Sequence, residues 1–348
     1  MDQAIDDIKV DTLRTNCTEA GAFYAKNITD TSATLGWTAG CTDSAYSIEY
    51  GLSGFAPGTG NIVNSTADTV DINGLSSLTN YDFYVTVMCT GGFSSIQSGP
   101  GNVLTACSSQ LSGVYTLDPS SPASATNFVL MDDFLSFVSN CGISGPTTLN
   151  VAAGSGPYVM NYDLGAFLGM SAVNPLVING NGNVVNHGGG SYFLALNGVK
   201  HVTINDFMFV NENTSNTGVY GIMMRGGCDS IQITNNTIDL GTSITTSASG
   251  CIVASNSISS ATTAGLNADN ILIDNNTLIG AYYGIRLNGT SNTVKSAGNK
   301  ITNNIFEDNS TYPVYCINQE KLLIDNNDFS RPNRSIISTY YPVYTTYG

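Results

Sequence analysis

The sequence predicts an all-β chain in which a β-sandwich is followed by a single-stranded, right-handed parallel β-helix with a short capping helix at its N-terminal end. Three observations carry this prediction. Two phrases recur through the second half, the strands there have a period of two residues with no room for a long helix, and short alternating strands in the first half surround a single Trp. Self-similarity at a fixed period of about 30 residues marks a solenoid.

The first repeated phrase is an apolar residue, a polar residue, an Asn pair and, two residues on, a second apolar residue. Clear copies begin at Ile233, Ile273, Ile301 and Ile324, and looser copies at Ile178 and Ile204. A second phrase alternates with it and starts at residues 192, 220, 250, 283, 312 and 341, in steps of 28, 30, 33, 29 and 29 residues. Within it Ile222 and Met224 are expected to point inward, and Met223 and Arg225 outward.

Three segments follow in order. Residues 1–15 are expected to be a linker or the tail of an upstream domain, residues 16–108 the sandwich, and residues 109–348 the β-helix, with a capping segment at 113–150 and rungs over about 151–348. Residues 4–10 resemble the last strand of jelly-roll domains related to MAM modules. The last repeat stops without a cap, so we interpret the chain as cut at both ends.

The first domain carries more specific signals than its class. Trp37, the Gly74-Leu75 pair, the Leu78-Thr79-x-Tyr81 corner and the closing Thr105 resemble a fibronectin type III domain. The resemblance implies that Tyr81 is the tyrosine-corner residue and that Trp37 is buried. It also implies that the loop after the Trp37 strand meets the end of the Tyr81 strand, which favours a Cys41–Cys89 disulfide. Such a domain is a spacer more often than a ligand-binding module, and no Arg-Gly-Asp sequence is present.

The junction between the domains predicts the cap. From Ser124 to Cys141 the residues Phe128, Met131, Leu135 and Val138 follow helical spacing, and the pattern stops at Gly142. A short amphipathic helix here would cover the open end of the solenoid. Residues 141–154 resemble the start of β-helix domains in large modular secreted proteins of bacteria. A Cys107–Cys141 disulfide across the junction is a second, weaker expectation.

Composition limits the partners and the compartment. Charged residues make up 11% of the chain and the formal net charge is −15, so a nucleic-acid partner is not expected. No apolar run is long enough to span a membrane, and the first residues are not a signal peptide. The Ser/Thr/Asn/Gly-rich, Lys-poor sequence nevertheless indicates an extracellular or cell-surface protein, so we expect a fragment of a larger secreted chain.

The cysteines and histidines do not predict a metal site. Cys228 and Cys316 fall at inward positions and are expected to be buried thiols. With two histidines and no Cys-x-x-Cys pair, a structural zinc site is not expected. No cofactor is predicted; calcium would serve the lyase alternative below, but no motif indicates it.

The Asn pairs are interpreted as structural. Asn tolerates the left-handed backbone of a tight turn, and amides stacked rung on rung can hydrogen-bond along the column. The expected ladder consists of Asn236, Asn276, Asn304 and Asn327.

A ligand site is sought among outward positions. Arg286, Tyr315 and Tyr344 share one outward column, with Arg225 in the next. Aromatic rings there could stack on sugars, while guanidinium groups hold carboxylates. The alternative, which we favour, is that these four residues pack under a neighbouring loop or domain.

Catalysis is left open, with a preference against it. Parallel β-helices include polysaccharide lyases and glycoside hydrolases, which need clustered acids with a base or an acid pair at a suitable separation. Asp274 and Asp325 share an outward position, but Thr302 lies between them, which separates them by roughly 10 Å at 4.8 Å per rung. No catalytic residue is therefore assigned.

The leading hypothesis is an adhesin-like, carbohydrate-contacting structural module, monomeric as this fragment, from a secreted or cell-surface bacterial protein. A polysaccharide lyase or hydrolase of the parallel β-helix type is the first alternative. A phage tail fibre or tailspike is the second; it would explain the missing signal peptide and predicts a trimer.

Overall fold

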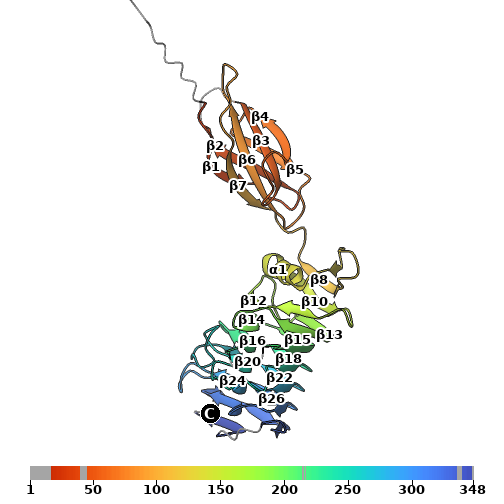
Figure 1. Ribbon diagram of the computed structural model, residues 1–348, viewed down its shortest axis with the longest axis vertical. Coiled ribbons are helices and arrows are strands. Elements are labelled where there is room, and N and C mark those ends of the chain that lie inside the picture. Colours follow the sequence, from red (N-terminus) through yellow and green to blue (C-terminus); the bar gives the residue numbers. More distant parts are fainter. Residues whose placement is uncertain (1–16, 40–44, 214, 216, 335–338, 347–348) are drawn as a thin grey trace, which may run out of the picture. The chain divides into compact units, whose positions relative to one another are not determined.

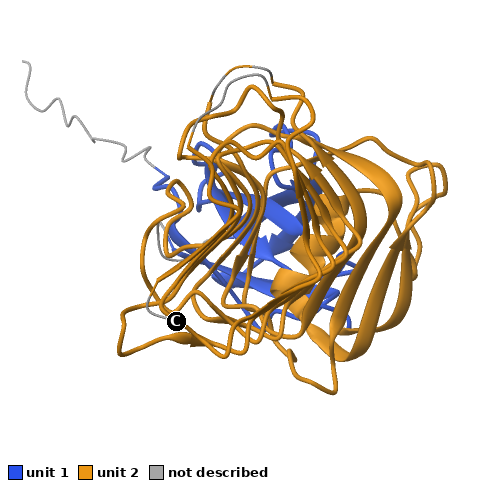
Figure 2. Ribbon diagram, turned by 90° about the horizontal axis from the view of Figure 1, so that it is seen from below, with its two compact units in different colours: residues 1–109 blue, residues 110–348 orange. Residues whose placement is uncertain are grey.

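The computed structural model describes residues 17–39, 45–213, 215, 217–334 and 339–346. The chain divides into two compact units, Met1–Ser109 and Gln110–Gly348 (Figure 2). Within the described residues the structure is built of strands and turns with one α-helix, which confirms the predicted all-β class. The segment compared with a jelly-roll strand, residues 4–10, lies outside the described residues.

Unit 1 is a sandwich of two antiparallel sheets (Figure 1). One sheet has the order β1-β2-β5, with β1 at Gly21–Lys26, β2 at Ser32–Thr38 and β5 at Thr69–Asn73. The other has the order β4-β3-β6-β7, with β3 at Ala45–Leu52, β4 at Asn61–Ser65, β6 at Asn80–Met88 and β7 at Ser98–Leu104. Alternate residues of these strands fill the space between the sheets, because successive side chains of a strand point to opposite faces.

Trp37 and Tyr81 lie where the sequence predicts them, in the core and at the tyrosine corner. Trp37 is buried in the core, where its ring meets that of Tyr46 edge-on at 5.1 Å between centroids. The hydroxyl oxygen of Tyr81 accepts a hydrogen bond from the backbone N–H of Ser76 at 2.9 Å. This backbone contact a few residues upstream is the tyrosine corner. Together with the sheet order it gives unit 1 the fibronectin type III fold.

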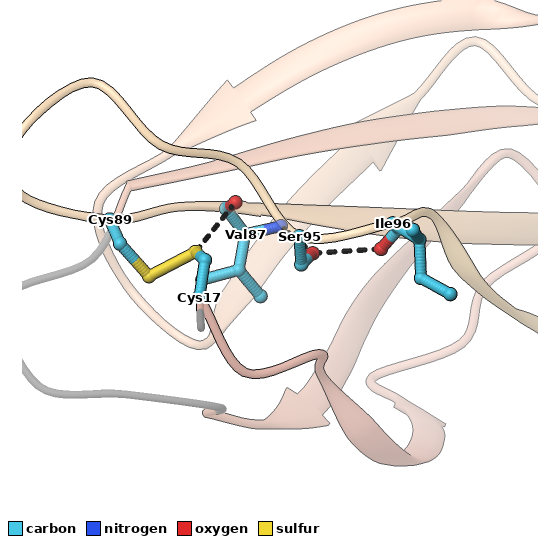
Figure 3. The surroundings of a disulfide bond; sticks show 5 residues. All are labelled: Cys17, Val87, Cys89, Ser95 and Ile96. Carbon is cyan, nitrogen blue, oxygen red and sulfur yellow. Dashed lines mark hydrogen bonds between the residues drawn. A yellow bond between two sulfur atoms is a disulfide. The ribbon is translucent and has the colours of Figure 1, made fainter. Parts of the chain in front are cut away.

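The disulfide of unit 1 joins Cys17 to Cys89, with 5.8 Å between the Cα atoms (Figure 3). The predicted Cys41–Cys89 pair is therefore wrong, and Cys41 itself lies outside the described residues. The reason is the path of the chain. The segment that enters β1 passes the end of β6, where the Cys17 sulfur lies 3.3 Å from the carbonyl oxygen of Val87. Cys107 and Cys141 are each disulfide-bonded, and their pairing with each other stays a prediction.

Unit 2 is a parallel β-helix whose turns superimpose when it is viewed along its axis (Figure 2). Its largest sheet has fourteen strands. They are β8 (Leu111–Leu117), β9 (Asn127–Phe128), β10 (Ile143–Val151), β11 (Tyr158–Met160), β13 (Leu176–His187), β15 (Val202–Val210), β18 (Gln232–Thr234), β19 (Thr237–Asp239), β22 (Leu272–Asp274), β23 (Thr277–Ile279), β26 (Lys300–Thr302), β27 (Ile305–Glu307), β30 (Leu323–Asp325) and β31 (Asp328–Ser330).

A second, seven-stranded sheet carries the phrase that begins with Tyr. Its strands, in order, are β12 (Tyr162–Gly165), β14 (Tyr192–Asn197), β16 (Tyr220–Arg225), β20 (Gly250–Ala254), β24 (Tyr283–Asn288), β28 (Tyr312–Ile317) and β32 (Val343–Thr346). Two short pairs complete the coil: β17 (Cys228–Asp229) with β21 (Ala268–Asp269), and β25 (Ser296–Ala297) with β29 (Gln319–Glu320).

Register follows the repeat. Ile233, Ile273, Ile301 and Ile324 are direct partners on successive rungs. The first three are completely buried and belong to one continuous apolar core. Ile222 and Met224 belong to that core, whereas Met223 belongs to a separate cluster on the outer face of the seven-stranded sheet. The inward and outward assignment made from the period-2 pattern is thus confirmed.

Helix α1 spans Met131–Cys141 and lies at the β8 end of the coil (Figure 1). Met131, Phe134, Leu135 and Val138 are buried in the solenoid core, which confirms the capping helix. The helix begins later than the spacing suggests, because Phe128 lies in β9. The Asn127 side chain binds the backbone carbonyls of Asp118, Ser121 and Pro122 at 3.1–3.2 Å. These local bonds compete with helix formation.

Candidate functional site

The outer face of the seven-stranded sheet carries a column of tyrosines at the first position of its strands. Tyr192, Tyr220, Tyr283 and Tyr312 are aligned by the strand register, and Gly250 holds this position in β20. Parallel strands lie about 4.8 Å apart, so neighbours in a column touch. A Cβ added at Gly250 would lie 2.6 Å from Cγ2 of Val253, so the face has no room for a side chain there.

At the β28–β32 end the column becomes a stack of rings. The rings of Tyr283 and Tyr312 are 5.8 Å apart and 17° from parallel, and those of Tyr312 and Tyr341 are 5.3 Å apart and 12° from parallel. The next column contributes Tyr315 and Tyr344, whose centroids are 4.6 Å apart. Tyr283 is 5% exposed and Tyr341 is 43% exposed, so the stack runs from the interior of the face to solvent.

Arg286 lies under these rings. Its guanidinium carbon is 3.6 Å from the ring centroid of Tyr315 and 5.3 Å from that of Tyr283. The side chain is 5% exposed. A cation placed over aromatic faces in a desolvated site gains about 2 kcal/mol or more. The tyrosines therefore stabilise the buried charge.

Asn288 fixes the orientation of that guanidinium. Its Oδ1 accepts the Nε–H of Arg286 at 2.7 Å. Its amide nitrogen donates to the carbonyl oxygens of Ala254 and Ala261 at 2.7 Å each. Asn288 is 2% exposed. An amide with both ends bound in this way cannot turn without losing buried hydrogen bonds.

The middle of the face is covered by a loop. Ala261, from the segment between β20 and β21, packs in one apolar cluster with Ala195, Met223, Val253 and Tyr220. All five are at most 2% exposed. None of these five is among the four residues weighed as ligand-binding from the sequence, and the open part of the face is the tyrosine stack near β28 and β32.

Burial also sets the ionisation of the tyrosines. It raises the pKa of Tyr283 to about 12, although the nearby Arg286 charge acts in the opposite direction. Burial likewise raises the pKa of Tyr312, with neighbouring tyrosines adding to the effect. These hydroxyls are neutral at pH 7, so the face presents neutral rings above one fixed positive charge.

Of the four residues proposed as ligand-binding, the structure brings three together. Arg286, Tyr315 and Tyr344 are contiguous across β24, β28 and β32. Arg225 lies in β16, separated from β24 by β20. It forms an ion pair with Asp163 of β12 instead. Arg225 therefore stands apart from the tyrosine stack.

Sequence reasoning did not single out Tyr283, Tyr312, Tyr341 or Asn288. A signal was present, because the repeated phrase begins with Tyr in most copies. In the structure this first position faces outward together with the Arg286 column. The role of Asn288 has no such signal, because it depends on the path of the loop that contains Ala261.

The four asparagines of the inner column form a hydrogen-bonded ladder. The amide nitrogens of Asn236, Asn276 and Asn304 each donate to Oδ1 of the Asn on the next rung, at 3.0–3.1 Å. The ladder ends at Asn327. Asn236, Asn276 and Asn304 are at most 1% exposed. These side chains are occupied in holding successive turns together.

Asp274, one of the two acidic residues considered for catalysis, is likewise engaged in hydrogen bonds. Oδ1 of Asp274 accepts hydrogen bonds from the Thr302 hydroxyl at 2.6 Å and the Asn303 amide at 2.7 Å. Thr302 lies between Asp274 and Asp325 in the register. Among the described residues, no three His, Cys, Asp or Glu side chains are grouped closely enough to hold a metal ion. In the same part of the chain, no helix is long and apolar enough to cross a membrane.

Several solved fibronectin domains resemble part of the chain. They include the fn3 domain of human contactin 1, with 17% identity and a TM-score of 0.25 over 28% of this chain and 85% of that chain. An FN3 domain of human collagen XX has 25% identity and a TM-score of 0.21 over 25% of this chain and 91% of that chain. The chicken CNTN1 FN1-FN3 structure matches at 13% identity and TM-score 0.23 over 25% of this chain, which spans only 30% of that chain. A search of curated proteins gives no match. Residues 174–329 match the family model of the right-handed β-helix region, which agrees with the coil of unit 2.

Proposed function

We propose that this chain is part of a large secreted or cell-surface bacterial protein, and that unit 2 is an adhesin-like structural module that contacts carbohydrate without catalysis in this segment. The observation that carries the proposal is the tyrosine stack that emerges from the outer face of the seven-stranded sheet. Tyr341 is 43% exposed, and Tyr344 beside it is partly exposed. Several large rings of limited rotational freedom gathered at one place form an amphipathic contact surface.

Sugar rings suit this surface. One face of a pyranose is made largely of C–H groups and can lie on a tyrosine ring, while the sugar hydroxyls stay free for hydrogen bonds. The tyrosine hydroxyls can then donate hydrogen bonds to the sugar or accept them from it. Arg286 beneath the rings adds a positive charge to the otherwise neutral surface.

The disulfide of unit 1 supports the extracellular part of the proposal. Disulfides persist in oxidising compartments and are rare in the cytosol. The Cys17–Cys89 bridge closes a loop with a sequence separation of 72 residues. Its constraint on the unfolded chain stabilises such a small sandwich.

The test is a joint binding and cleavage screen of the whole chain against neutral and acidic polysaccharides, with and without calcium. The proposal expects binding without cleavage, weakened by Tyr344→Ala and Tyr315→Ala. New reducing ends or unsaturated uronate would overturn the non-catalytic part and favour the lyase or hydrolase alternative. If the chain neither binds nor cleaves any of the glycans, the proposed contact with carbohydrate is overturned. In size-exclusion chromatography with light scattering we expect a monomer, and a tight trimer would favour the tail-fibre alternative.

A further inference from the structure

Arg286 carries a charge that the described part of the chain does not balance. The residue is 5% exposed, and no carboxylate of a described residue lies within ion-pair distance of its guanidinium. A buried charge without an opposite charge costs free energy that hydrogen bonds and ring contacts offset only in part. Arg225, which lies on the same face, differs in this respect because Asp163 neutralises it.

The contacts of Arg286 are made by Nε and by the faces of two tyrosine rings. Nε donates to Oδ1 of Asn288, and the guanidinium carbon lies over the rings of Tyr315 and Tyr283, whose planes are perpendicular to each other. The terminal Nη1 and Nη2 atoms donate to no group in the described residues, and neither is among the fully buried polar atoms that lack a partner. The N–H groups on Nη1 and Nη2 of Arg286 are therefore free to donate, and this edge of the guanidinium reaches solvent.

We propose that Arg286 donates hydrogen bonds to an anionic group of the bound glycan, a carboxylate or a sulfate, while the sugar ring that carries it lies on the tyrosine stack. This inference rests on the proposed function and names its ligand class. The terminal N–H groups of a guanidinium are parallel donors, spaced to meet two oxygens of one carboxylate or sulfate. The ligand supplies the counter-charge that no described residue provides at this point.

Asn288 acts as a positioning residue. It touches Arg286 at Nε and is anchored to two backbone carbonyls, so it fixes the direction of the free edge of the guanidinium. A fixed donor pair loses little conformational entropy when the anion binds. Releasing Asn288 would thus weaken recognition of the anion more than stacking of the sugar.

The experiment measures affinity of the full chain for matched oligosaccharide pairs of equal length. One pair is an oligouronate and its methyl ester, and the other is a sulfated oligosaccharide and its unsulfated parent. We expect the wild type to bind the charged member of at least one pair about tenfold or more tightly, as a charge-assisted hydrogen-bond pair allows. The pair that shows the preference identifies the anion. Added salt is expected to reduce it.

Three variants assign the preference to Arg286. Arg286→Met, which keeps an unbranched chain, should abolish the preference for the charged member over the neutral member of the pair. Asn288→Ser should lower that ratio of affinities as well, a readout that general destabilisation does not move. Arg225→Met is the matched control, because its charge is already paired, and it should leave the ratio unchanged.

Two results separate the inference from the proposed function. Equal affinity for both members of each pair in the wild type, with both weakened by Tyr344→Ala, would overturn the inference and leave carbohydrate contact standing. Absence of binding to every member would overturn both. Because the wild-type comparison needs no variant, the inference is tested even if Arg286→Met does not fold.

Discussion

Single asparagines do two different jobs in the β-helix, and their order in the pair decides which. The first Asn of each pair turns the chain: Asn235, Asn275, Asn303 and Asn326 have φ between 50° and 58°. The second points inward and joins the buried ladder. Both roles follow from Asn chemistry, since Asn tolerates the left-handed region and its amide is donor and acceptor at once. The pairs could therefore be interpreted from the sequence.

Removing one ladder amide should be costly. Asn276→Ala removes the donor to the Ile233 carbonyl at 2.8 Å and the acceptor for the Asn236 N–H at 2.9 Å. It leaves these backbone groups buried and unpaired, so we expect a loss of about 2 kcal/mol or more in unfolding free energy. Urea denaturation followed by circular dichroism measures it. The matched change Asn275→Gly, at a positive φ that suits Gly, should cost less than about 0.5 kcal/mol; equal costs would contradict the ladder's role.

The burial of Arg286 shows what a residue pattern leaves out. Period-2 alternation places Arg286 outward, and the strand register agrees. How deeply the Arg286 side chain is buried depends on Asn288 and on the loop that carries Ala261. That loop has no periodicity and no fixed length between repeats, so its path could not be predicted. The same limit applies to Cys17, whose partner is set by the path of an irregular segment.

Among the elements, the strands were easier to predict than the start of helix α1 or the tyrosine column on the outer face of the seven-stranded sheet. Every strand of the Tyr phrase is fixed by its repeat, because a slip of one residue would turn apolar side chains outward. The start of α1 was misplaced because helical spacing alone ignores the Asn127 side chain, whose three carbonyl contacts organise the turn before β9. The tyrosine column is likewise a property of aligned strands rather than of one residue.

The buried tyrosines of this column predict instability at high pH. Burial raises the pKa of Tyr220 and of Tyr283 to about 12, from 10.0 for an exposed tyrosine. Because the folded state holds these two hydroxyls in the neutral form, high pH favours the unfolded state, in which they ionise more readily. The folded state keeps its full stability below the pKa of a tyrosine in the unfolded chain and loses stability as pH rises between about 10 and 12. Circular dichroism against pH should show unit 2 unfolding in that window, and Tyr283→Phe should move the midpoint upward. Full tyrosine ionisation near pH 10 with the fold intact would contradict this.

The whole molecule joins two ways of building β-structure in one chain. Unit 1 pairs its strands antiparallel around Trp37, and unit 2 stacks parallel rungs that contact their neighbours only. The repeat was sufficient to predict unit 2, and the short alternating strands around Trp37 together with the Leu78-Thr79-x-Tyr81 corner predicted unit 1. Cysteine connectivity could not be predicted, since spacing in the sequence leaves several pairings open.

The thiols and disulfides of the chain can be mapped at once. Peptide mapping without reduction should recover a Cys17–Cys89 link, and the Cys107–Cys141 link stays our expectation for the second bridge. Cys228, Cys251 and Cys316 are buried free thiols. Burial raises the pKa of all three, that of Cys316 to about 12. They should resist alkylation until the protein is unfolded, and labelling in the native state would contradict their burial.

The central claim is that the exposed end of the tyrosine stack binds carbohydrate. The most direct measurement is the dissociation constant of the best glycan from the screen, by calorimetry, for the wild type, Tyr344→Ala and Tyr24→Ala. Tyr24 is a tyrosine of unit 1 that is 42% exposed, and it serves as the control. The account predicts that Tyr344→Ala weakens binding about tenfold, as loss of an aromatic contact does, while Tyr24→Ala leaves it unchanged. Equal affinities in all three proteins would contradict it.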